Sequence, residues 1–412
     1  MKKSTLILLL TALSISLTAQ TWESVIEENA DYHYNAVQFL NEDEGYVIGS
    51  GPESSTPVVL KTTDGGENWT DVANDLPEGY VNTLAFSDVN TGFITLSSGK
   101  IFLTTDGGEN WTQMLTDEDG NVFTVKYAGN YNDADVFYAF TASKIYKTID
   151  MGESWELAYN HGSNVFVTAV LTNGNGISFG SENKALFAYG SDNGELYMYD
   201  GEEAYSVYES THANPFSCVF AVSDDVYFAS SGTRFVRVTD PGEDNQITNN
   251  LTNALYINAL NFLDINHGFG ATSTGDIYFL KNLGSSYTKE YDGDIQLNGV
   301  SIASNSSVFA CGKGIILKRS GNIVDDNTSV FGMETGKNIF RIYPNPSNGE
   351  INIELTESMQ NALYEVYDIS GRKIIASQLI NSTCSKINLD SGVYLIVVSD
   401  GKFSQVEKAI IF

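Results

Sequence analysis

The sequence has few basic residues for its length. Its 412 residues include 22 Lys and Arg against 52 Asp and Glu, so the formal net charge is -30 at pH 7. Proteins that bind nucleic acid or an anionic membrane surface need clustered cations to neutralise phosphate groups. The charge balance therefore argues against both as partners.

Proline and charged residues are also scarce. There are only 7 Pro, and charged residues make up 18% of the chain, whereas hydrophobic residues reach 42%, aromatic residues 12%, and Gly counts 37. Disordered chains have the opposite composition, with little hydrophobic and much charged material. The composition indicates a folded chain of two or three domains, most of it β-structure.

Long apolar runs are absent except at the start of the chain. Lys2 and Lys3 precede an apolar stretch from Leu6 to Leu17, and small residues follow up to Ala19. This pattern is typical of a secretory signal peptide, whereas a membrane-spanning helix needs about 18 apolar residues or more. We expect residues 1–19 to be a signal peptide and the mature chain to have no membrane span.

Cysteine and histidine are too few and too dispersed for a metal site. Cys218, Cys311 and Cys384 form no C-x-x-C pair, and each lies in an apolar, strand-like segment, which predicts buried free thiols. The four histidines are far apart and in unlike contexts. We expect no metal and no cofactor.

A repeat of about 40 to 45 residues, a period typical of propeller blades, organises most of the chain. The sequence T-T-D-G-G-E-N-W-T occurs at 62–70 and again at 104–112, and T-I-D-M-G-E-S-W-E at 148–156 is a third copy. An apolar or aromatic strand residue lies four positions before each Asp, and the same strand recurs where the Asp is lost. Seven such anchors follow one another: Leu60, Phe102, Tyr146, Tyr197, Phe235, Tyr278 and Ile316.

Each repeat contains at least three strands upstream of the Trp and one after it, with Asn, Asp and Gly at the turns. Four antiparallel strands per unit and seven units predict a seven-bladed β-propeller over residues 20–325. The seventh unit lacks an outer strand, and T-W-E-S-V around Trp22 resembles an outer strand with nothing before it. We therefore expect residues 21–26 to complete the last blade.

The repeated segment resembles the Asp box, or BNR repeat, of sialidases, sortilin-like receptors and photosystem II assembly factors, and the turns before the second strands favour the assembly-factor subgroup. An Asp two residues before a Gly suits a hairpin in which the carboxylate accepts backbone N–H groups. The resemblance implies a structural motif on the side of the propeller away from the ligand face. The matching residues are Asp64, Gly66, Trp69, Asp106, Gly108, Trp111, Asp150, Gly152 and Trp155.

The resemblance to sialidases does not extend to their chemistry. That family holds a carboxylate with three arginines, but the propeller has only Arg234, Arg237 and Arg319, and the first two lie three apart in one strand, so they point to opposite faces. No pair of carboxylates stands out for glycoside hydrolysis either. We assign no catalytic residue, and a polysaccharide-active glycoside hydrolase of the Asp-box type remains the alternative function.

A different pattern begins after a polar linker at 326–337. Alternating apolar residues and Gly turns over 338–412 predict a small Ig-like β-sandwich. It resembles the type A C-terminal sorting domain of the type IX secretion system of Bacteroidetes. The residues that match are Tyr343, Pro344, Asn345, Pro346, Gly349, Asp368, Gly371, Gly392 and Tyr394.

The resemblance implies export through that system to the cell surface or medium, with the translocon and its sorting peptidase as partners. Loops on the ligand face of the propeller are rich in Asn, Asp, Ser and Tyr, which suits hydrogen bonding and stacking to a glycan or protein. We therefore expect a secreted or surface binding protein. The loops are 49–56, 116–121, 201–214, 243–253 and 290–295.

Overall fold

The structure is a computed structural model in which strands are the only regular elements among the described residues. This all-β architecture follows from the alternation of apolar residues and Gly-rich turns in the sequence. The described residues are 21–324 and 340–412, without 27, 115–121, 123, 161–174, 190–193, 210–214, 233, 243–246, 253–254, 357–361, 369–372, 381–383, 390 and 400–403.

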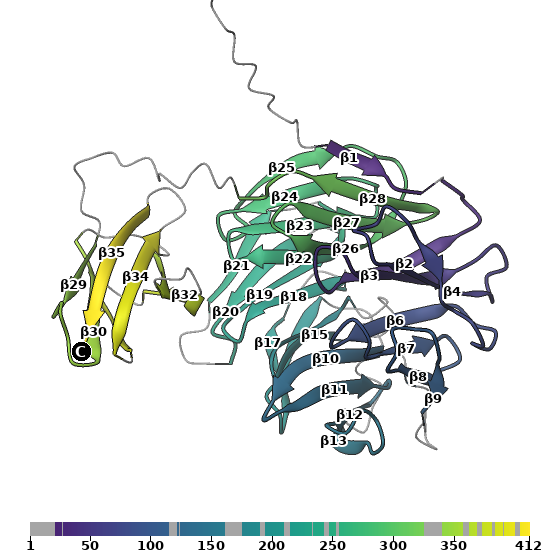
Figure 1. Cartoon of the computed structure of the whole chain (residues 1–412), viewed down its shortest axis with the longest axis horizontal. Helices are drawn as coiled ribbons and strands as arrows, with labels where there is room; N and C mark the ends of the chain where they lie inside the picture. Colours follow the sequence, from purple (N-terminus) through teal and green to yellow (C-terminus); the bar gives the residue numbers. More distant parts are fainter. Residues whose placement is uncertain are drawn as a thin grey trace, which may run out of the picture.

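The first 28 strands form seven four-stranded antiparallel sheets, one after another along the chain (Figure 1). We number these sheets as blades 1 to 7, and in each blade the first strand of the repeat is the innermost. Blade 1 contains β2 (His33–Phe39), β3 (Gly45–Ser50), β4 (Pro57–Thr62) and β5 (Thr70–Asp71); blade 2 contains β6 (Val81–Phe86), β7 (Gly92–Leu96), β8 (Ile101–Thr104) and β9 (Thr112–Gln113); blade 3 contains β10 (Thr124–Tyr131), β11 (Ala134–Phe140), β12 (Lys144–Thr148) and β13 (Glu156–Asn160).

The remaining blades follow the same order. Blade 4 contains β14 (Ile177–Ser181), β15 (Lys184–Tyr189), β16 (Glu195–Tyr199) and β17 (Ala204–Tyr208); blade 5 contains β18 (Cys218–Ser223), β19 (Val226–Ser231), β20 (Arg234–Thr239) and β21 (Ile247–Thr252); blade 6 contains β22 (Ile257–Asp264), β23 (His267–Thr272), β24 (Ile277–Lys281) and β25 (Ser286–Tyr291); blade 7 contains β26 (Leu297–Ser304), β27 (Ser307–Gly312), β28 (Ile315–Ser320) and the N-terminal β1 (Thr21–Ser24).

The N-terminal strand β1 is the outer strand of blade 7, where it lies beside β28 in Figure 1. Trp22 pairs with Arg319 in the antiparallel register, and its ring packs edge-on against Phe269 of blade 6 at 6.0 Å between centroids. Arg319 is fully buried and its Nε donates to Glu290 Oε2 of blade 6 at 2.7 Å. The first and last segments of the ring are therefore joined to each other and to the preceding blade.

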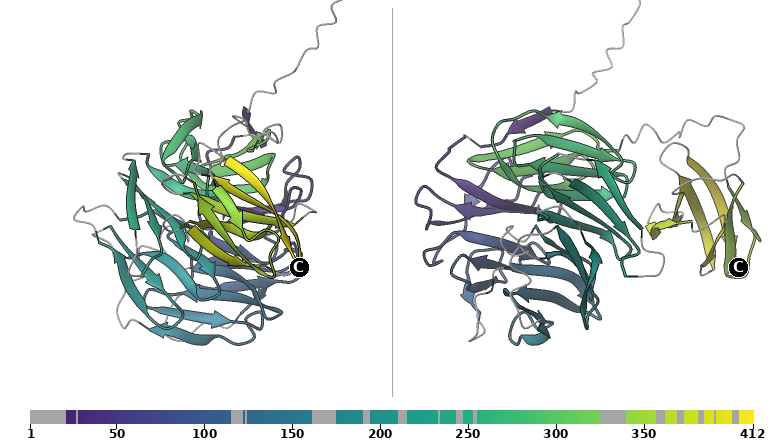
Figure 2. Two further views of the ribbon diagram at one scale, coloured as in Figure 1. Left: turned by 90° about the vertical axis from the view of Figure 1, so that its left-hand side faces the viewer. Right: turned by 180° about the vertical axis from the view of Figure 1, so that it is seen from behind.

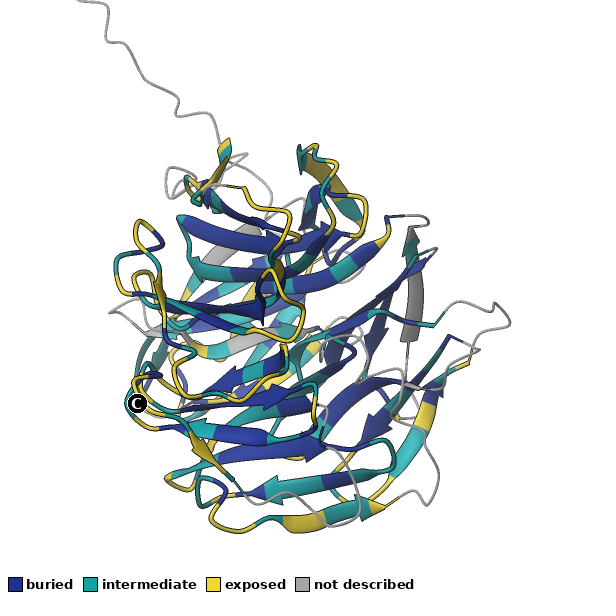
Figure 3. Ribbon diagram, turned by 90° about the vertical axis from the view of Figure 1, so that its right-hand side faces the viewer, coloured by how far each residue is buried: buried dark blue, intermediate teal, exposed yellow. Residues whose placement is uncertain are grey.

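Apolar side chains fill the spaces between neighbouring blades. Figure 3 shows exposed positions concentrated on the outermost strands and turns. The second strand of blade 1, β3, is buried along its whole length, whereas both residues of β5 are exposed. Cys218 and Cys311 are buried free thiols, and burial raises the pKa of each thiol. The expectation of burial is wrong for Cys384, which is exposed because it lies at the start of an edge strand, β33 (Cys384–Asn388).

The innermost strands carry a ring of side-chain contacts between blades that the sequence analysis did not identify. The segments 34–39, 81–86, 257–262 and 297–302 align as Y-N-A-V-Q-F, V-N-T-L-A-F, I-N-A-L-N-F and L-N-G-V-S-I. In each of the four, the pairing register shifts at the Asn, so this residue forms a β-bulge.

Three of these asparagines bond to the first carbonyl of the next segment around the ring. Asn35 Nδ2 donates to Val81 O at 2.9 Å, Asn258 Nδ2 to Leu297 O at 3.0 Å, and Asn298 Nδ2 to Tyr34 O at 2.9 Å. The last of these bonds joins blade 7 to blade 1, so the inner strands help to close the ring as well. The repeated dipeptide Tyr/Val/Ile/Leu-Asn was visible in the sequence and could have predicted this contact.

The last seven strands form a separate unit of two sheets (Figure 2). Buried side chains from both sheets, including Phe340, Ile351, Val366 and Ile396, make one core. One sheet has the order β29-β30-β33 and the other β32-β31-β34-β35; the bounds are β29 (Phe340–Tyr343), β30 (Glu350–Leu355), β31 (Leu363–Asp368), β32 (Lys373–Leu379), β33 (Cys384–Asn388), β34 (Gly392–Ser399) and β35 (Ser404–Ile411).

The residues of the expected sorting motif occupy turns and strand ends of this unit. Asn345 is hydrogen-bonded to the last strand, donating to Lys408 O and accepting from Ile410 N. Asp368 and Tyr394 are paired across β31 and β34, and Gly371 lies outside the described residues. Tyr343 ends β29, Pro344 and Pro346 flank Asn345, Gly349 has a φ of 117°, and Gly392 begins β34.

Candidate functional site

Each of the three Asp boxes forms the same pattern of hydrogen bonds, at the turn between the third and fourth strands of blades 1, 2 and 3. In blade 2, Thr104 Oγ1 donates to Asp106 Oδ1 at 2.8 Å and accepts from Gly108 N at 2.8 Å, while Asp106 accepts from Asn110 N at 2.9 Å and from Asn110 Nδ2 at 2.7 Å. The bond from the Asn110 side chain is the main cause that holds the pKa of Asp106 below its usual value, and the bond from the Asn110 backbone is the next. The same lowering applies to Asp64 and Asp150.

The Gly of each box lies against the preceding blade. Gly66, Gly108 and Gly152 have φ values of 82°, 93° and 78°, which favour glycine. A Cβ on Gly66 would lie 2.6 Å from Phe309 of blade 7, and one on Gly108 would lie 2.9 Å from Val72 of blade 1. The box is therefore a joint between blades.

The Trp of each box contacts the same preceding blade. The Trp69 ring is 6.5 Å from Phe309, the Trp155 ring is 5.8 Å from Phe93 of blade 2, and Trp111 Nε1 donates to Val72 O at 2.8 Å. Each Trp therefore helps to join its blade to the one before it.

We expect Thr104→Val to destabilise the protein. Thr104 is 1% exposed, and the change removes the hydroxyl that accepts from Gly108 N. An unsatisfied buried amide costs about 1–3 kcal/mol in the free energy of unfolding. Urea unfolding measures this loss; Thr112→Val, at an exposed position of β9, is the control and should leave the midpoint unchanged. A full-length protein of unaltered stability would contradict the structural role of the box.

A cavity of about 300 Å³ occupies the centre of the propeller, and each of the seven innermost strands contributes to its wall. Apolar side chains from four blades, among them Val37, Leu84, Ile177 and Leu260, form part of the wall. Among the described residues that line the cavity there is no carboxylate, and the one charged side chain is Lys126.

Asn175 lies at the end of this cavity where the innermost strands begin. Its Nδ2 donates across the ring to Asn258 O at 3.1 Å and to Asn298 O at 2.8 Å. The loops that enter the innermost strands, and the turns that join second to third strands, lie at the same end because the strands of each blade are antiparallel. We call this end of the propeller the mouth.

Two exposed tyrosines occupy equivalent positions at the mouth. Tyr80 and Tyr256 immediately precede the innermost strands β6 and β22, and their exposed fractions are 41% and 44%. Each accepts a backbone hydrogen bond through its carbonyl from the following hairpin, at Ser97 N and Ser273 N. The backbone of both residues is therefore held while the rings remain available to a partner.

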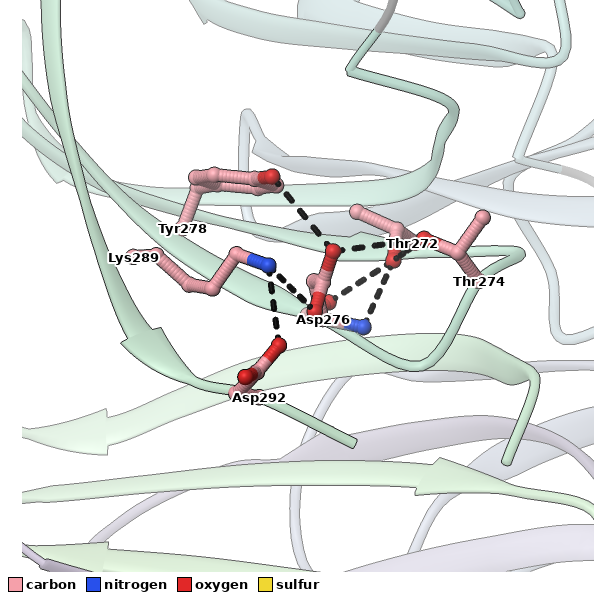
Figure 4. Close-up of polar contacts among 6 residues, drawn as sticks. All are labelled: Thr272, Thr274, Asp276, Tyr278, Lys289 and Asp292. Carbon is pink, nitrogen blue, oxygen red and sulfur yellow. Dashed lines mark hydrogen bonds and ion pairs between the residues drawn. The ribbon is translucent and has the colours of Figure 1, made fainter. Parts of the chain in front are cut away.

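An ion-pair cluster fixes the mouth at blade 6 (Figure 4). Lys289 Nζ lies 3.0 Å from Asp276 Oδ1 and 2.9 Å from Asp292 Oδ1, which joins the turn between β23 and β24 to the loop after β25. Thr272 Oγ1 accepts from Asp276 N at 2.8 Å. The bond from Lys289 lowers the pKa of Asp292, so this carboxylate is ionised at neutral pH rather than protonated as a general acid requires.

The three propeller arginines do not converge. Arg234 packs over the Phe216 ring at 4.9 Å, and Arg237 Nη1 donates to Leu283 O of blade 6 at 3.1 Å, so the two point to opposite faces of blade 5. Arg319 pairs with Glu290 as described above. All three contact neighbouring blades, and the first two point to opposite faces as their spacing predicts.

The mouth loops expected from the sequence are described in part. Loop 290–295 contributes Asp292 to the cluster of Figure 4. Loop 49–56 ends in a backbone bond from Gly51 N to Thr56 O at 3.0 Å. Loop 116–121 lies outside the described residues, as do residues 210–214, 243–246 and 253 of the other two.

Two general features of the described residues bear on function. They contain no helix that could cross a membrane. No group of three or more His, Cys, Asp and Glu side chains within them is arranged to hold a metal ion.

Two families match the sequence in separate segments. Residues 13–281 match the family of the photosynthesis system II assembly factor YCF48, and residues 341–412 match the secretion system C-terminal sorting domain. No curated protein matches the sequence. The first match spans more than half of the chain.

Solved structures with low sequence identity share the fold. YCF48 bound to D1 peptide is 17% identical with a TM-score of 0.58, over 73% of this chain and 97% of that one. YCF48 from Cyanidioschyzon merolae is 16% identical with a TM-score of 0.56, over 72% and 98%. PorZ, a surface component of the type IX secretion system of Porphyromonas gingivalis, is 14% identical with a TM-score of 0.51, over 91% of this chain and 59% of PorZ.

These identities support a common fold and nothing finer. The blade architecture and these structures show that the molecule is an all-β propeller protein. The family match at 341–412 adds a sorting domain for the type IX secretion system. The chain belongs to the YCF48 family of photosynthesis system II assembly factors.

Proposed function

We propose that this protein is a secreted or cell-surface binding protein whose propeller mouth recognises an extracellular glycan or protein. The observation that carries the proposal is the pair of exposed tyrosines, Tyr80 and Tyr256, on a mouth whose turns are held by hydrogen bonds and by the Lys289 cluster. Exposed aromatic rings on a preorganised surface provide contact area at little entropic cost. A polypeptide partner is favoured by the related YCF48 structure, which is described as bound to D1 peptide.

The route to this partner follows from the two ends of the chain. We propose that residues 1–19 are a signal peptide for export to the periplasm and that the domain at 338–412 then directs passage through the outer membrane, as in Bacteroidetes. The linker at 326–337 separates this domain from the propeller. On this proposal the translocon and a sorting peptidase are partners of the C-terminal domain alone.

A binding screen with matched variants tests the role of the mouth. Purified full-length protein is applied to a peptide array and to a glycan array, and the double variant Tyr80→Ala with Tyr256→Ala is compared with the wild type on the strongest ligand. Losing aromatic contacts at the centre of an interface costs about 2 kcal/mol or more, so we expect affinity to fall by about 30-fold.

The control is Ile149→Ala, because Ile149 is 60% exposed but lies in the Asp-box turn of blade 3. That turn follows the third strand and is at the opposite end of the blade from the mouth. We expect the control to bind as the wild type does. Equal binding by the double variant, or a loss confined to the control, would refute the assignment of the mouth.

The alternative function, a polysaccharide-active glycoside hydrolase, has less support. It needs two carboxylates placed for acid and base chemistry. The described lining of the central cavity has none, and Asp276 and Asp292 at the mouth are both ion-paired with Lys289. Release of reducing ends from any glycan that binds on the array would favour this alternative over a binding role.

A further inference from the structure

The central cavity contains one cation without an acidic partner. Lys126 is on β10, at the fifth position of the inner-strand segment in blade 3, where blades 1, 4 and 6 carry the neutral side chains Gln38, Ser178 and Asn261. Within the described part of the chain, the ammonium group of Lys126 makes no hydrogen bond and no ion pair. Its position thus adds a charge to a wall that is otherwise uncharged.

Two of these neutral side chains, Gln38 and Ser178, accept a hydrogen bond from the next blade, which Lys126 cannot do. Gln38 Oε1 accepts from Phe86 N at 3.1 Å, and Ser178 Oγ accepts from Ala221 N at 2.9 Å, each across a blade boundary. A lysine ammonium has donors alone and cannot accept such a bond. A role in joining the blades therefore does not explain why a lysine occupies position 126.

The electrostatic environment of Lys126 favours a bound anion. Burial lowers the pKa of its ammonium to about 8, so the group is largely protonated at pH 7 but poorly solvated. Tyr127 is the other titratable side chain in the wall; its hydroxyl donates to Asp135 at 3.0 Å, and burial is the main cause that raises its pKa to about 12. The Lys126 side chain is only partly exposed, and among the described residues its ammonium lacks the counter-ion that a charge withdrawn from water normally has.

Further donors face the cavity from other blades. The side-chain amide of Asn261 in blade 6 lines the cavity and has no hydrogen-bond partner among the described residues. The Ser178 hydroxyl accepts a bond from Ala221 N and retains its own proton to donate. Apolar groups complete the wall, including Leu84, Val219 and Leu260.

We propose that this cavity is a binding site for a short aliphatic carboxylate, with Lys126 as its counter-ion and Asn261 as a second donor. A volume of about 300 Å³ is at the small end of ligand sites in proteins, which suits a ligand of a few carbon atoms. The carboxylate meets the ammonium and amide donors, and the alkyl chain lies against the apolar wall. The site is separate from the mouth and goes beyond the proposed function.

Butyrate is the probe, and its uncharged analogue butyramide is the matched control ligand. We expect isothermal titration calorimetry at pH 7 to detect butyrate binding to the full-length protein and to find butyramide at least tenfold weaker. Lys126→Met should abolish butyrate binding, and Lys126→Arg should retain part of it. Lys313→Met removes the same charge from an exposed position on the turn between β27 and β28 and should bind as the wild type does.

The pH dependence gives a second readout. Because the ammonium is the binding form, affinity should fall as pH rises from 7 to 9 through the pKa of Lys126, and binding at pH 8 should take up protons, seen as a dependence of the enthalpy on the buffer. Equal binding of butyrate and butyramide, binding unchanged in Lys126→Met, or no butyrate binding up to about 10 mM would overturn the proposal. Thermal unfolding checks that Lys126→Met is folded, which we expect because the change removes a partly buried charge that has no ion-pair partner among the described residues.

Discussion

Deleting residues 21–26 should open the propeller and lower its free energy of unfolding by about 3 kcal/mol or more, a loss comparable to the truncation of one large buried aromatic side chain. The deletion removes β1, the pairing partner of β28, and the contact of Trp22 with Phe269. It also removes Val25 and Ile26, which pack against the buried cluster between blades 7 and 1. Urea unfolding of the deleted and intact proteins measures the difference.

Ring opening also predicts a change in assembly. Without β1, the unpaired edge of β28 can pair with another chain, because exposed strand edges favour association. We expect dimers or larger species in size-exclusion chromatography. The control is Trp22→Ala, which keeps the strand and should lose less stability and elute at the same volume as the intact protein. An unchanged urea midpoint together with an unchanged elution volume would contradict closure by the N-terminal strand.

Removal of the C-terminal domain should leave a folded propeller that no longer reaches the cell surface. The domain has its own core, including Phe340 and Ile351, no described strand of the propeller pairs with it, and Leu363 is its one residue in a propeller core cluster of the described residues. A chain ending at residue 335 should therefore unfold at nearly the same temperature as the propeller transition of the full-length protein. In a host with a type IX secretion system it should accumulate in the periplasm.

Cell fractionation with immunoblotting measures this change in location. The expected result is a loss of nearly all of the protein from the surface and medium, with a matching periplasmic pool. A full-length Arg341→Gln variant serves as a control for a minor change in the domain, because the side chain of Arg341 is exposed in its pair with Glu354. Surface delivery of the truncated chain at the full-length level, without lysis, would contradict a sorting role.

The sequence predicted the all-β propeller because its repeat has local chemistry. The Thr, Asp and Gly of each box form hydrogen bonds with one another within a few residues, so the motif can be recognised from a short stretch of sequence. The same turn persists in blade 6 where the Asp is replaced: Asn282, Leu283 and Gly284 all have positive φ, and Asn282 Nδ2 donates to Ser286 Oγ at 2.9 Å. Strand order within each blade followed from the same repeat.

Features that depend on how the blades meet could not be predicted in the same way. Lys126 lies in an ordinary strand sequence, T-V-K-Y, and its isolation in a cavity depends on side chains from six other blades. The exposure of Cys384 depends on the edge position of β33, which its sequence does not reveal. The cross-channel bonds of Asn175 likewise join residues more than 80 positions apart.

The two kinds of joint between blades point in opposite directions along the chain. An Asp box contacts the blade before it, as Gly108 contacts Val72, and an inner-strand Asn contacts the blade after it, as Asn35 contacts Val81. Blade 1 has both an Asp box and an inner-strand Asn bonded to blade 2, so this repeat supplies one half of the joint to each of its neighbours. A second copy of such a repeat inserted beside the first would leave no unmatched half, so a ring built from repeats of this kind can gain a blade while its joints stay the same.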